Sequence, residues 1–343
     1  MKRPLLVPTL FFLIAFVLGN CTLPPFSLET ATVTPSPAPP PAVEETPLLP
    51  TAELGLAENP IILALPPSAE TTPEQVNAAR EIAAQFTERT GYVVVVIAPQ
   101  SYAALVEALE SGNAHIALLD PLSYALAYQK DLVRAQYAVT KNDAPAYGVQ
   151  FLAPRRGGYT SYFNSEIGEN TADAAVALAQ FSDKKPCWSE ETSLSGYLIP
   201  LGMLKQAQVQ TRTAAFVGGH ATVVRSLYVG GICDFGATYI DARKFPSLED
   251  EMPDLLEQVL VVWRSPDIIP YQVLAFSTKM PEPMRALFRE LIPAIRQTEA
   301  GHAAFQTAYG FEAIQAVNDS DFRDFHTFMQ AAGLDLKALL TER

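Results

Sequence analysis

Two serines and a glycine stand together in Ser193-Leu194-Ser195-Gly196, the stretch of this chain best suited to bind an anion. An apolar run follows through Met203 and Leu204, as expected of a helix that enters a core. The first turn of a helix offers N–H groups without intrahelical partners at the positive end of the helix dipole. Together with the hydroxyls they make an oxyanion site. Serine is also a common helix cap, and the spacing alone leaves both interpretations open.

The elements around this stretch predict two α/β units. In the first, we expect strands over 61–65, 93–97 and 115–119, alternating with helices that begin at 73, 102 and 121. The β-branched run 93–97 is typical of a parallel strand buried on both faces. In the second, we expect strands over 147–153, 187–188, 232–239 and 259–263, with helices over 173–181 and 222–228. An extended segment over 273–276 and helices over 282–296, 301–309 and 319–332 complete the chain.

Residues 1–21 are typical of an export signal, with Lys2 and Arg3 before an apolar segment too short to span a membrane. The following Leu18-Gly19-Asn20-Cys21 resembles the bacterial lipobox, although Asn20 replaces the usual Gly or Ala. It predicts a lipid on Cys21. The alternative is a plain secretory signal cut near that residue.

Residues 22–59 contain no Lys or Arg and are rich in proline, so they predict an extended, disordered tether. A proline-rich recognition motif is the alternative, but nothing in the chain implies its partner. The net charge of −13 argues against nucleic acid as a partner and does not exclude an anionic ligand, because N–H groups and hydroxyls bind anions without a basic surface. Besides Cys21, the chain has Cys187 and Cys233, which are either a disulfide or two buried thiols.

Six segments, in register, resemble the substrate-binding proteins of phosphate/phosphite/phosphonate ABC transporters, over roughly residues 60–335. They are the strand–helix–strand over 61–97, Tyr102–Gly112, Asp120-Pro121-Leu122-Ser123-Tyr124, Ser193–Pro200, Gly218–Val223 and Ser265–Pro270. The resemblance implies a type II periplasmic-binding-protein fold. Residues 60–145 and 272–343 would form lobe 1 and 146–271 lobe 2, joined by two hinge crossings, with the ligand in the cleft between the lobes.

The resemblance also implies site residues. Ser193, Ser195 and the N–H groups over 194–197, which include those of Leu194, Gly196 and Tyr197, would hold the oxyanion. His220 would donate a further bond, and a charge if protonated. Tyr102 and Tyr124 would close the pocket from lobe 1. The alternatives are that His220 caps its own helix, that Tyr102 lies on a solvated face and that Tyr124 belongs to the core.

This chain departs from the family pattern at three positions. Asp120 replaces a Gly, Leu194 stands where a Thr hydroxyl often helps, and Tyr271-Gln272 stands where an Asp often holds an amine. Gln272 keeps a hydrogen-bonding side chain but no charge, which makes aminophosphonates less favoured ligands.

We therefore expect a monomeric, lipid-anchored solute-binding protein on the outer face of the cytoplasmic membrane, which delivers a small oxyanion to an ABC permease. We expect no cofactor and no metal. A sensor or orphan binding protein using the same cleft is the alternative function. An enzyme is disfavoured, because the chain lacks Gly-x-Ser-x-Gly and His-Glu-x-x-His motifs.

Overall fold

A computed structural model describes residues 53–68 and 70–341 of the chain. The export signal, Cys21 and most of the proline-rich segment lie outside the described residues. Among those described, no helix is long and apolar enough to cross a membrane.

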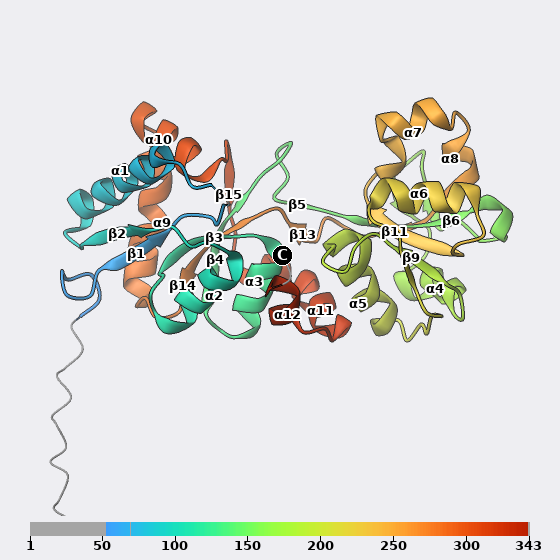
Figure 1. The fold of residues 1–343 in the computed structure, drawn as a ribbon, viewed down its shortest axis with the longest axis horizontal. Helices are drawn as coiled ribbons and strands as arrows, with labels where there is room; N and C mark the ends of the chain where they lie inside the picture. Colours follow the sequence, from blue (N-terminus) through green and yellow to red (C-terminus); the bar gives the residue numbers. More distant parts are fainter. Residues whose placement is uncertain (1–52, 69, 342–343) are drawn as a thin grey trace, which may run out of the picture. The chain divides into compact units, whose positions relative to one another are not determined.

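The first sheet has six strands in the order β15-β4-β14-β3-β1-β2 (Figure 1). Its strands are β1 (Ile61–Ala64), β2 (Val94–Ile97), β3 (Ile116–Leu119), β4 (Val133–Val139), β14 (Val273–Ser277) and β15 (Ile314–Ala316). β1 pairs in parallel with β2 and β3, whereas β14 runs antiparallel to β3 and β4. The sheet is therefore mixed, with the late strand β14 inserted between two early ones.

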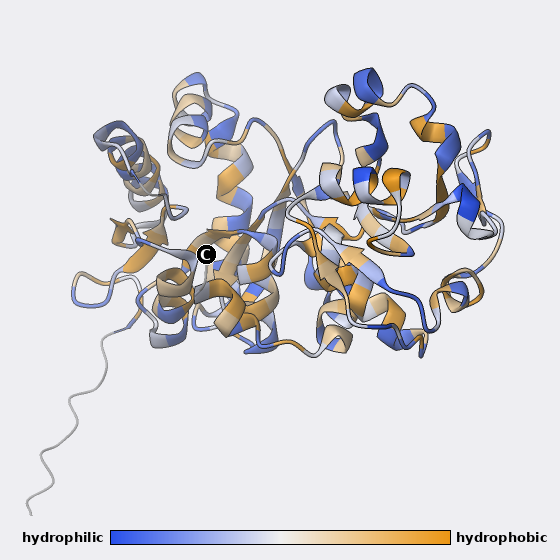
Figure 2. Ribbon diagram, turned by 45° about the vertical axis from the view of Figure 1, so that its right-hand side comes forward, coloured by the Kyte–Doolittle hydropathy of each residue, from blue (hydrophilic) through white to orange (hydrophobic). Residues whose placement is uncertain are grey.

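The helices of this unit begin and end where local signals predict. Thr72 caps α1 in a capping box with Gln75, and Gly91 ends the helix in the left-handed conformation. The Ser101 side chain caps α2 by accepting a hydrogen bond from the N–H of Ala104, and Gly112 ends that helix in the left-handed conformation. The helices are α1 (Pro73–Thr90), α2 (Tyr102–Ser111), α3 (Pro121–Gln129), α9 (Glu282–Arg296) and α10 (Glu299–Tyr309). In Figure 2 the central strands that they cover are mostly hydrophobic.

Two expectations for this unit are wrong, and one of its strands was not predicted. β2 is an edge strand paired only with β1, so it is not buried on both faces, and Val95 is 38% exposed. β4 was not expected, because Arg134 and Gln136 interrupt its apolar residues. The disordered tether does not extend to residue 59, since the carbonyl of Gly55 accepts a hydrogen bond from the N–H of Val93.

The second sheet has five strands in the order β10-β9-β11-β6-β12. They are β6 (Val149–Pro154), β9 (Pro186–Trp188), β10 (Ala215–Phe216), β11 (Phe235–Tyr239) and β12 (Val259–Arg264). β9 pairs in parallel with β10 and β11, and β6 runs antiparallel to β11 and β12. The helices are α4 (Ala174–Leu178), α5 (Ile199–Gln206), α6 (His220–Val229), α7 (Pro246–Glu251) and α8 (Leu255–Gln258), and a short ribbon joins β7 (Phe163–Asn164) to β8 (Glu169–Asn170).

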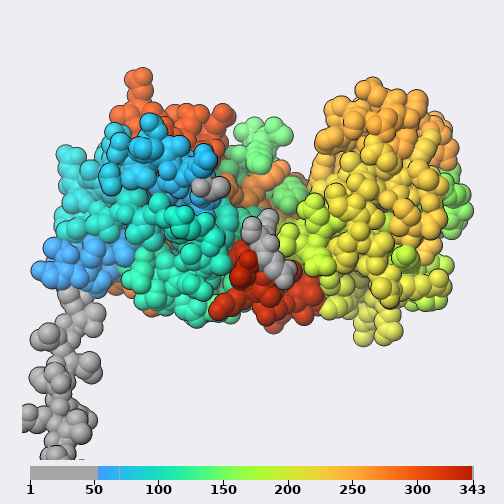
Figure 3. Space-filling model, in the orientation of Figure 1, coloured from blue at the N-terminus to red at the C-terminus, as the bar shows by residue number. Residues whose placement is uncertain are grey.

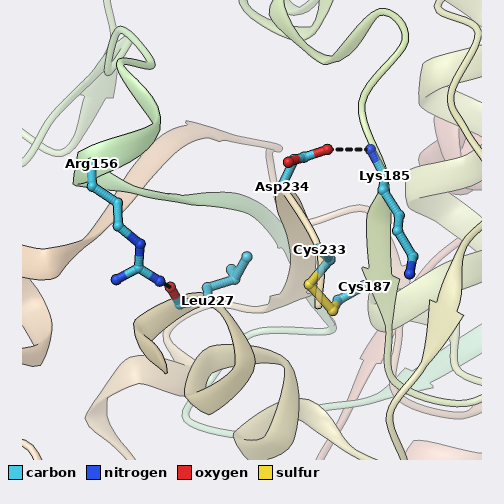
Figure 4. Close-up of a disulfide and its surroundings, with 6 residues drawn as sticks. All are labelled: Arg156, Lys185, Cys187, Leu227, Cys233 and Asp234. Carbon is cyan, nitrogen blue, oxygen red and sulfur yellow. Dashed lines mark hydrogen bonds between the residues drawn. A yellow bond between two sulfur atoms is a disulfide. The ribbon is translucent and has the colours of Figure 1, made fainter. Parts of the chain in front are cut away.

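Cys187 and Cys233 form a disulfide, with their Cα atoms 5.5 Å apart (Figure 4). Cys187 lies on β9, and Cys233 lies two residues before β11, the strand that pairs with β9. Beside the bond, the N–H of Lys185 donates to the Asp234 carboxylate over 2.8 Å. The disulfide thus ties together two neighbouring strands that are 46 residues apart in sequence.

Two short strands join the two sheets. β5 (Ala146–Tyr147) and β13 (Ile269–Pro270) pair antiparallel, with Ile269 opposite Tyr147. The second crossing is β13, and Val273 already belongs to the first sheet as the start of β14. The chain therefore passes between the sheets as a two-stranded ribbon.

The C-terminal helices α11 (Arg323–Ala332) and α12 (Leu336–Thr341) make a further link between the two units. A Cβ atom on Gly202 of α5 would lie 2.0 Å from the carbonyl oxygen of Phe328, so the two helices touch at this glycine. Lys205 of α5 donates to the carbonyl of Ala332. In Figure 3 the dark red C-terminal segment lies against the yellow-green one. The C-terminal segment, expected with lobe 1, therefore also contacts the second unit.

Candidate ligand-binding cleft

A cavity of about 440 Å³ is formed by residues from both units and from the ribbon between them. It is lined by Asp120, Pro121, Lys141, Tyr147, Leu194, Ser195, His220, Tyr239, Ile240 and Tyr271. Its walls thus come from the carboxyl ends of β3 and β11 and from helix starts, where ligands bind in open α/β sheets.

The turn Leu194–Leu198, which leads directly into α5, brings hydroxyl and N–H donors to this cavity. Ser193 is the cap, and its Oγ accepts a hydrogen bond from the N–H of Gly196 over 3.1 Å. The first turn, Leu194–Leu198, is a π-helix, because the N–H of Leu198 donates to the carbonyl of Ser193. The wide turn leaves the N–H groups of Leu194, Ser195 and Tyr197 outside the intrahelical ladder. Leu194 and Ser195 themselves line the cavity.

Gly196 is needed for close packing behind this turn. An added Cβ would lie 1.9 Å from Ser189 Oγ and 2.8 Å from Ser193 Oγ. Ser189 is the first residue after β9 and is 1% exposed, and its Oγ has no hydrogen-bond partner among the described residues. The absence of a side chain at Gly196 therefore allows the turn to pack against Ser189. It does not open space for an anion on the cavity side.

His220 opens α6 and faces the cavity beside Tyr239, with the two ring centroids 4.9 Å apart. The cap of α6 is Gly219, so His220 does not cap its own helix. Within the described chain its Nδ1 is buried without a partner. Burial lowers the pKa of His220 from 6.5 to about 4, so the imidazole is neutral at neutral pH and offers a hydrogen bond without a charge.

The opposite wall carries the charged groups. Lys141 Nζ lies 4.9 Å from the centroid of the Tyr271 ring, and Tyr271 stacks on Tyr147 with centroids 5.2 Å apart. Asp120 caps α3 and accepts from the N–H of Ser123 over 2.8 Å. The lining thus carries one cation and one carboxylate, and neutral donors make up the rest of its polar surface.

The tyrosines of the lining are donors. Burial and the nearby Asp241 raise the pKa of Tyr239, and burial and Asp267 raise that of Tyr271. Both phenols therefore keep their protons at neutral pH and can donate to ligand oxygens. No cluster of three or more His, Cys, Asp or Glu side chains suited to a metal ion occurs in the described part of the chain.

The comparisons with known proteins identify this arrangement. Residues 66–322 match the model of the periplasmic substrate-binding protein of phosphonate ABC transporters. The chain belongs to this family. The phosphate-import protein PhnD of Mycolicibacterium smegmatis is 26% identical over 235 residues, which are 66% of this chain and 68% of that protein. Solved structures of XAC2383 from Xanthomonas citri, bound to chloride or to ATP, are 13% identical to this chain, with TM-scores of 0.54. They cover 80% of this chain and 97% or 96% of theirs, and show the shared fold.

The protein is thus a substrate-binding protein with the two-lobed α/β fold of type II periplasmic binding proteins, and its family serves transport rather than catalysis. Three of the residues expected at its site, Leu194, Ser195 and His220, line the cleft. Ser193 and Gly196 shape the turn behind them.

The other expected residues of this binding protein lie elsewhere. Tyr124 is fully buried and its hydroxyl donates to Asp319 over 2.8 Å, so the expectation that it closes the pocket is wrong. Tyr102 lines a neighbouring cavity of about 340 Å³ that shares Asp120 with the cleft. Tyr197 packs on Phe216, with ring centroids 4.9 Å apart. Gln272 is half-buried beside the cleft residue Tyr271, and its carbonyl accepts from the N–H of Val139.

Sequence reasoning missed the contributions of Lys141, Tyr147, Tyr239 and Tyr271 to the cleft of this binding protein. Tyr147 and Tyr271 flank the two crossings, so their places beside the hinge strands were an available signal. Lys141 lies in the turn just before β5 and Tyr239 at the end of β11. These residues could have been predicted by selecting the polar or aromatic residues at or just after the end of each expected strand, because ligands bind there in open α/β sheets.

Proposed function

We propose that this substrate-binding protein captures a small oxyanion of the phosphate, phosphite or phosphonate type in its cleft and delivers it to an ABC permease. The observation that carries the proposal is the start of α5. The N–H groups of this turn that have no partner among the described residues, and the Ser195 hydroxyl, stand at the positive end of a helix, on the wall of a cavity of about 440 Å³. The similarity to a phosphate-import protein supports the same ligand class.

The charges of the cleft favour an anion held mainly by neutral donors. Ser195, His220, Tyr239 and the free N–H groups donate without adding net charge, and hydrogen bonds to a charged ligand are the strong ones. Lys141 supplies the cation of the lining. The Asp120 carboxylate would repel an anion. Asp120 caps α3, and its carboxylate accepts a hydrogen bond from the N–H of Ser123 in the first turn of that helix.

The ligand is identified by titrating the purified protein with phosphate, phosphite, methylphosphonate and sulfate. A ligand at 100 times its dissociation constant should raise the free energy of unfolding by about 2.7 kcal/mol. Absence of stabilisation by every phosphorus oxyanion would contradict the proposed ligand class.

The role of the α5 start is tested with Ser195→Ala in isothermal titration against the best ligand of that panel. A lost hydrogen bond to a charged group should weaken binding by about 10- to 150-fold. Ser226→Ala removes a buried serine from α6, outside the cleft lining, and is the matched control. Equal affinities of both variants and the natural protein would place the anion elsewhere.

We further propose that lipid on Cys21 anchors the protein to the outer face of the cytoplasmic membrane, and that 60–145 with 272–343 and 146–271 are its lobes. The lipobox-like Leu18-Gly19-Asn20-Cys21 supports the anchor. Cys21→Ala should then release the protein from membranes. Retention of that variant after alkaline washing would show that lipid on Cys21 is not the anchor.

A further inference from the structure

A second large cavity, of about 650 Å³, lies in the second unit and shares no lining residue with the cleft. Four cationic side chains line it: Arg155, Arg243, Lys244 and Arg264. Asp241 is the one carboxylate among its lining residues. We call this cavity the basic groove. It stands out because the chain as a whole carries a net charge of −13.

The sheet brings these cations together from distant parts of the sequence. Arg155 follows β6, Arg243 and Lys244 follow β11, and Arg264 ends β12. β6 runs antiparallel to β11 and β12, so Arg155 lies at one end of the paired strands, whereas Arg264 and the residues that follow β11 lie at the other. Leu260 and Val261 of β12 line the groove between these two ends. The cluster is therefore built by the fold rather than by a local run of charge.

Asp241 holds two of the arginines in place. Its carboxylate is 7% exposed and lies 2.7 Å from a terminal nitrogen of Arg243 and 2.7 Å from one of Arg264. Burial alone would raise the pKa of Asp241, but hydrogen bonds from Arg243 and Gln150 hold it at about 2, so the carboxylate is ionised. With Arg155 and Lys244 added, one negative charge faces four positive ones, which leaves the groove with an excess of three positive charges.

Several donors of the groove have no protein acceptor among the described residues. Arg155 Nε donates to the carbonyl of Glu257, and the terminal nitrogens of Arg155 have no protein acceptor among the described residues. Arg264 stacks over the Phe163 ring at 4.2 Å, and its buried Nε has no partner among the described residues. A planar guanidinium fixed in this manner can bind phosphoryl oxygens by paired hydrogen bonds.

We propose that the basic groove is a second anion-binding site, independent of the cleft, for a ligand with two or more phosphoryl groups. Its excess of three positive charges exceeds what a single small oxyanion neutralises. Its volume is also larger than that of the cleft, which suits a longer anion. Arg155 and Lys244, which are not committed to Asp241, contact the added phosphoryl groups.

The test is isothermal titration of the natural protein with inorganic tripolyphosphate at low and at moderate salt. We expect saturable binding that weakens with salt, because the contacts are electrostatic. Arg155→Gln with Lys244→Gln should weaken it by at least about tenfold, the loss expected for one hydrogen bond to a charged group. Arg80→Gln with Lys337→Gln changes the net charge equally outside the groove and should leave binding unchanged.

Three results would overturn the proposal. One is that the natural protein does not bind tripolyphosphate. Another is equal loss in both double variants, which would mean that only net charge matters. The third is loss in Ser195→Ala, which would assign the anion to the cleft. Retained tripolyphosphate binding in Ser195→Ala supports the groove whatever that variant does to the cleft ligand, so the two proposals fail separately.

Discussion

Gly196 packs directly against Ser189, and a Cβ atom on Gly196 would lie 1.9 Å from Ser189 Oγ. Only a glycine fits at this position without a shift of its neighbour. The contact joins the loop after β9 to the first turn of α5. It sets where the turn sits, and with it the positions of Leu194 and Ser195 on the cleft wall. The turn proposed to bind the anion is thus positioned by its packing against Ser189.

This contact predicts that Gly196→Ala destabilises the protein by more than about 1 kcal/mol, because overpacking a filled site typically costs about 1–3 kcal/mol. Ser189→Gly removes both the hydroxyl and the Cβ that the new methyl would meet. The double variant Ser189→Gly with Gly196→Ala should therefore recover part of the loss in chemical denaturation. Additive losses in the double variant would show that the contact with Ser189 is not the cause.

The sequence carried enough local information for the helix ends and for the Ser193 cap of the turn before α5. Thr72, Ser101 and Gly91 act within a few residues of their own positions, so their patterns suffice. The role of Gly196 could be misread, because its neighbour Ser189 meets it only after the chain has folded. Tyr124 was misassigned for a similar reason, since its partner Asp319 is 195 residues away.

The disulfide offers a second prediction. Closing a loop of 46 residues should stabilise the folded state by about 4 kcal/mol in the chain-entropy model. Cys187→Ala with Cys233→Ala should lower the free energy of unfolding by roughly that amount, measured in denaturant. Reducing agent should lower the stability of the natural protein and leave that of the double variant unchanged. If reduction destabilises both equally, the effect does not come from this bond.

His326 predicts a dependence of stability on pH. It is 9% exposed, stacks on Tyr128 with centroids 3.6 Å apart, and within the described residues both its nitrogens lack partners. Burial lowers its pKa from 6.5 to about 4. The unfolded chain therefore takes up a proton as the pH falls through 6.5 while the folded chain does not, and stability is lost between about pH 6.5 and 4 at roughly 1.4 kcal/mol per pKa unit.

His326→Phe keeps a ring beside Tyr128 and removes the two unpaired polar atoms. It should raise the free energy of unfolding at pH 7 by about 1–3 kcal/mol, the cost of a buried polar group without a partner. The variant should also lose less of its free energy of unfolding than the natural protein does as the pH falls from 6.5 to 4. His302→Phe, at an exposed position of α10, is the control. An unchanged pH profile in His326→Phe would mean that His326 does not contribute to the acid loss.

The last prediction concerns the one cation of the cleft lining. Lys141 is exposed, lies over the Tyr271 ring and faces the wall that carries Ser195, so it attracts an anion through solvent rather than through a buried ion pair. Exposed pairs of this kind contribute about 0.2–1 kcal/mol, which is roughly up to fivefold in affinity. Lys141→Met keeps the aliphatic contact with Tyr271 and should weaken the binding of the best phosphorus oxyanion by that factor at low salt. Because salt screens the attraction, the difference from the natural protein should vanish near 1 M salt, where the Debye length is about 3 Å.

Two variants are the controls for this prediction. Lys337→Met removes an exposed charge of α12 and should leave the affinity unchanged, whereas Lys141→Arg keeps the charge and should retain most of the affinity. A loss in Lys141→Met that persists at high salt would instead assign Lys141 to direct packing of the ligand.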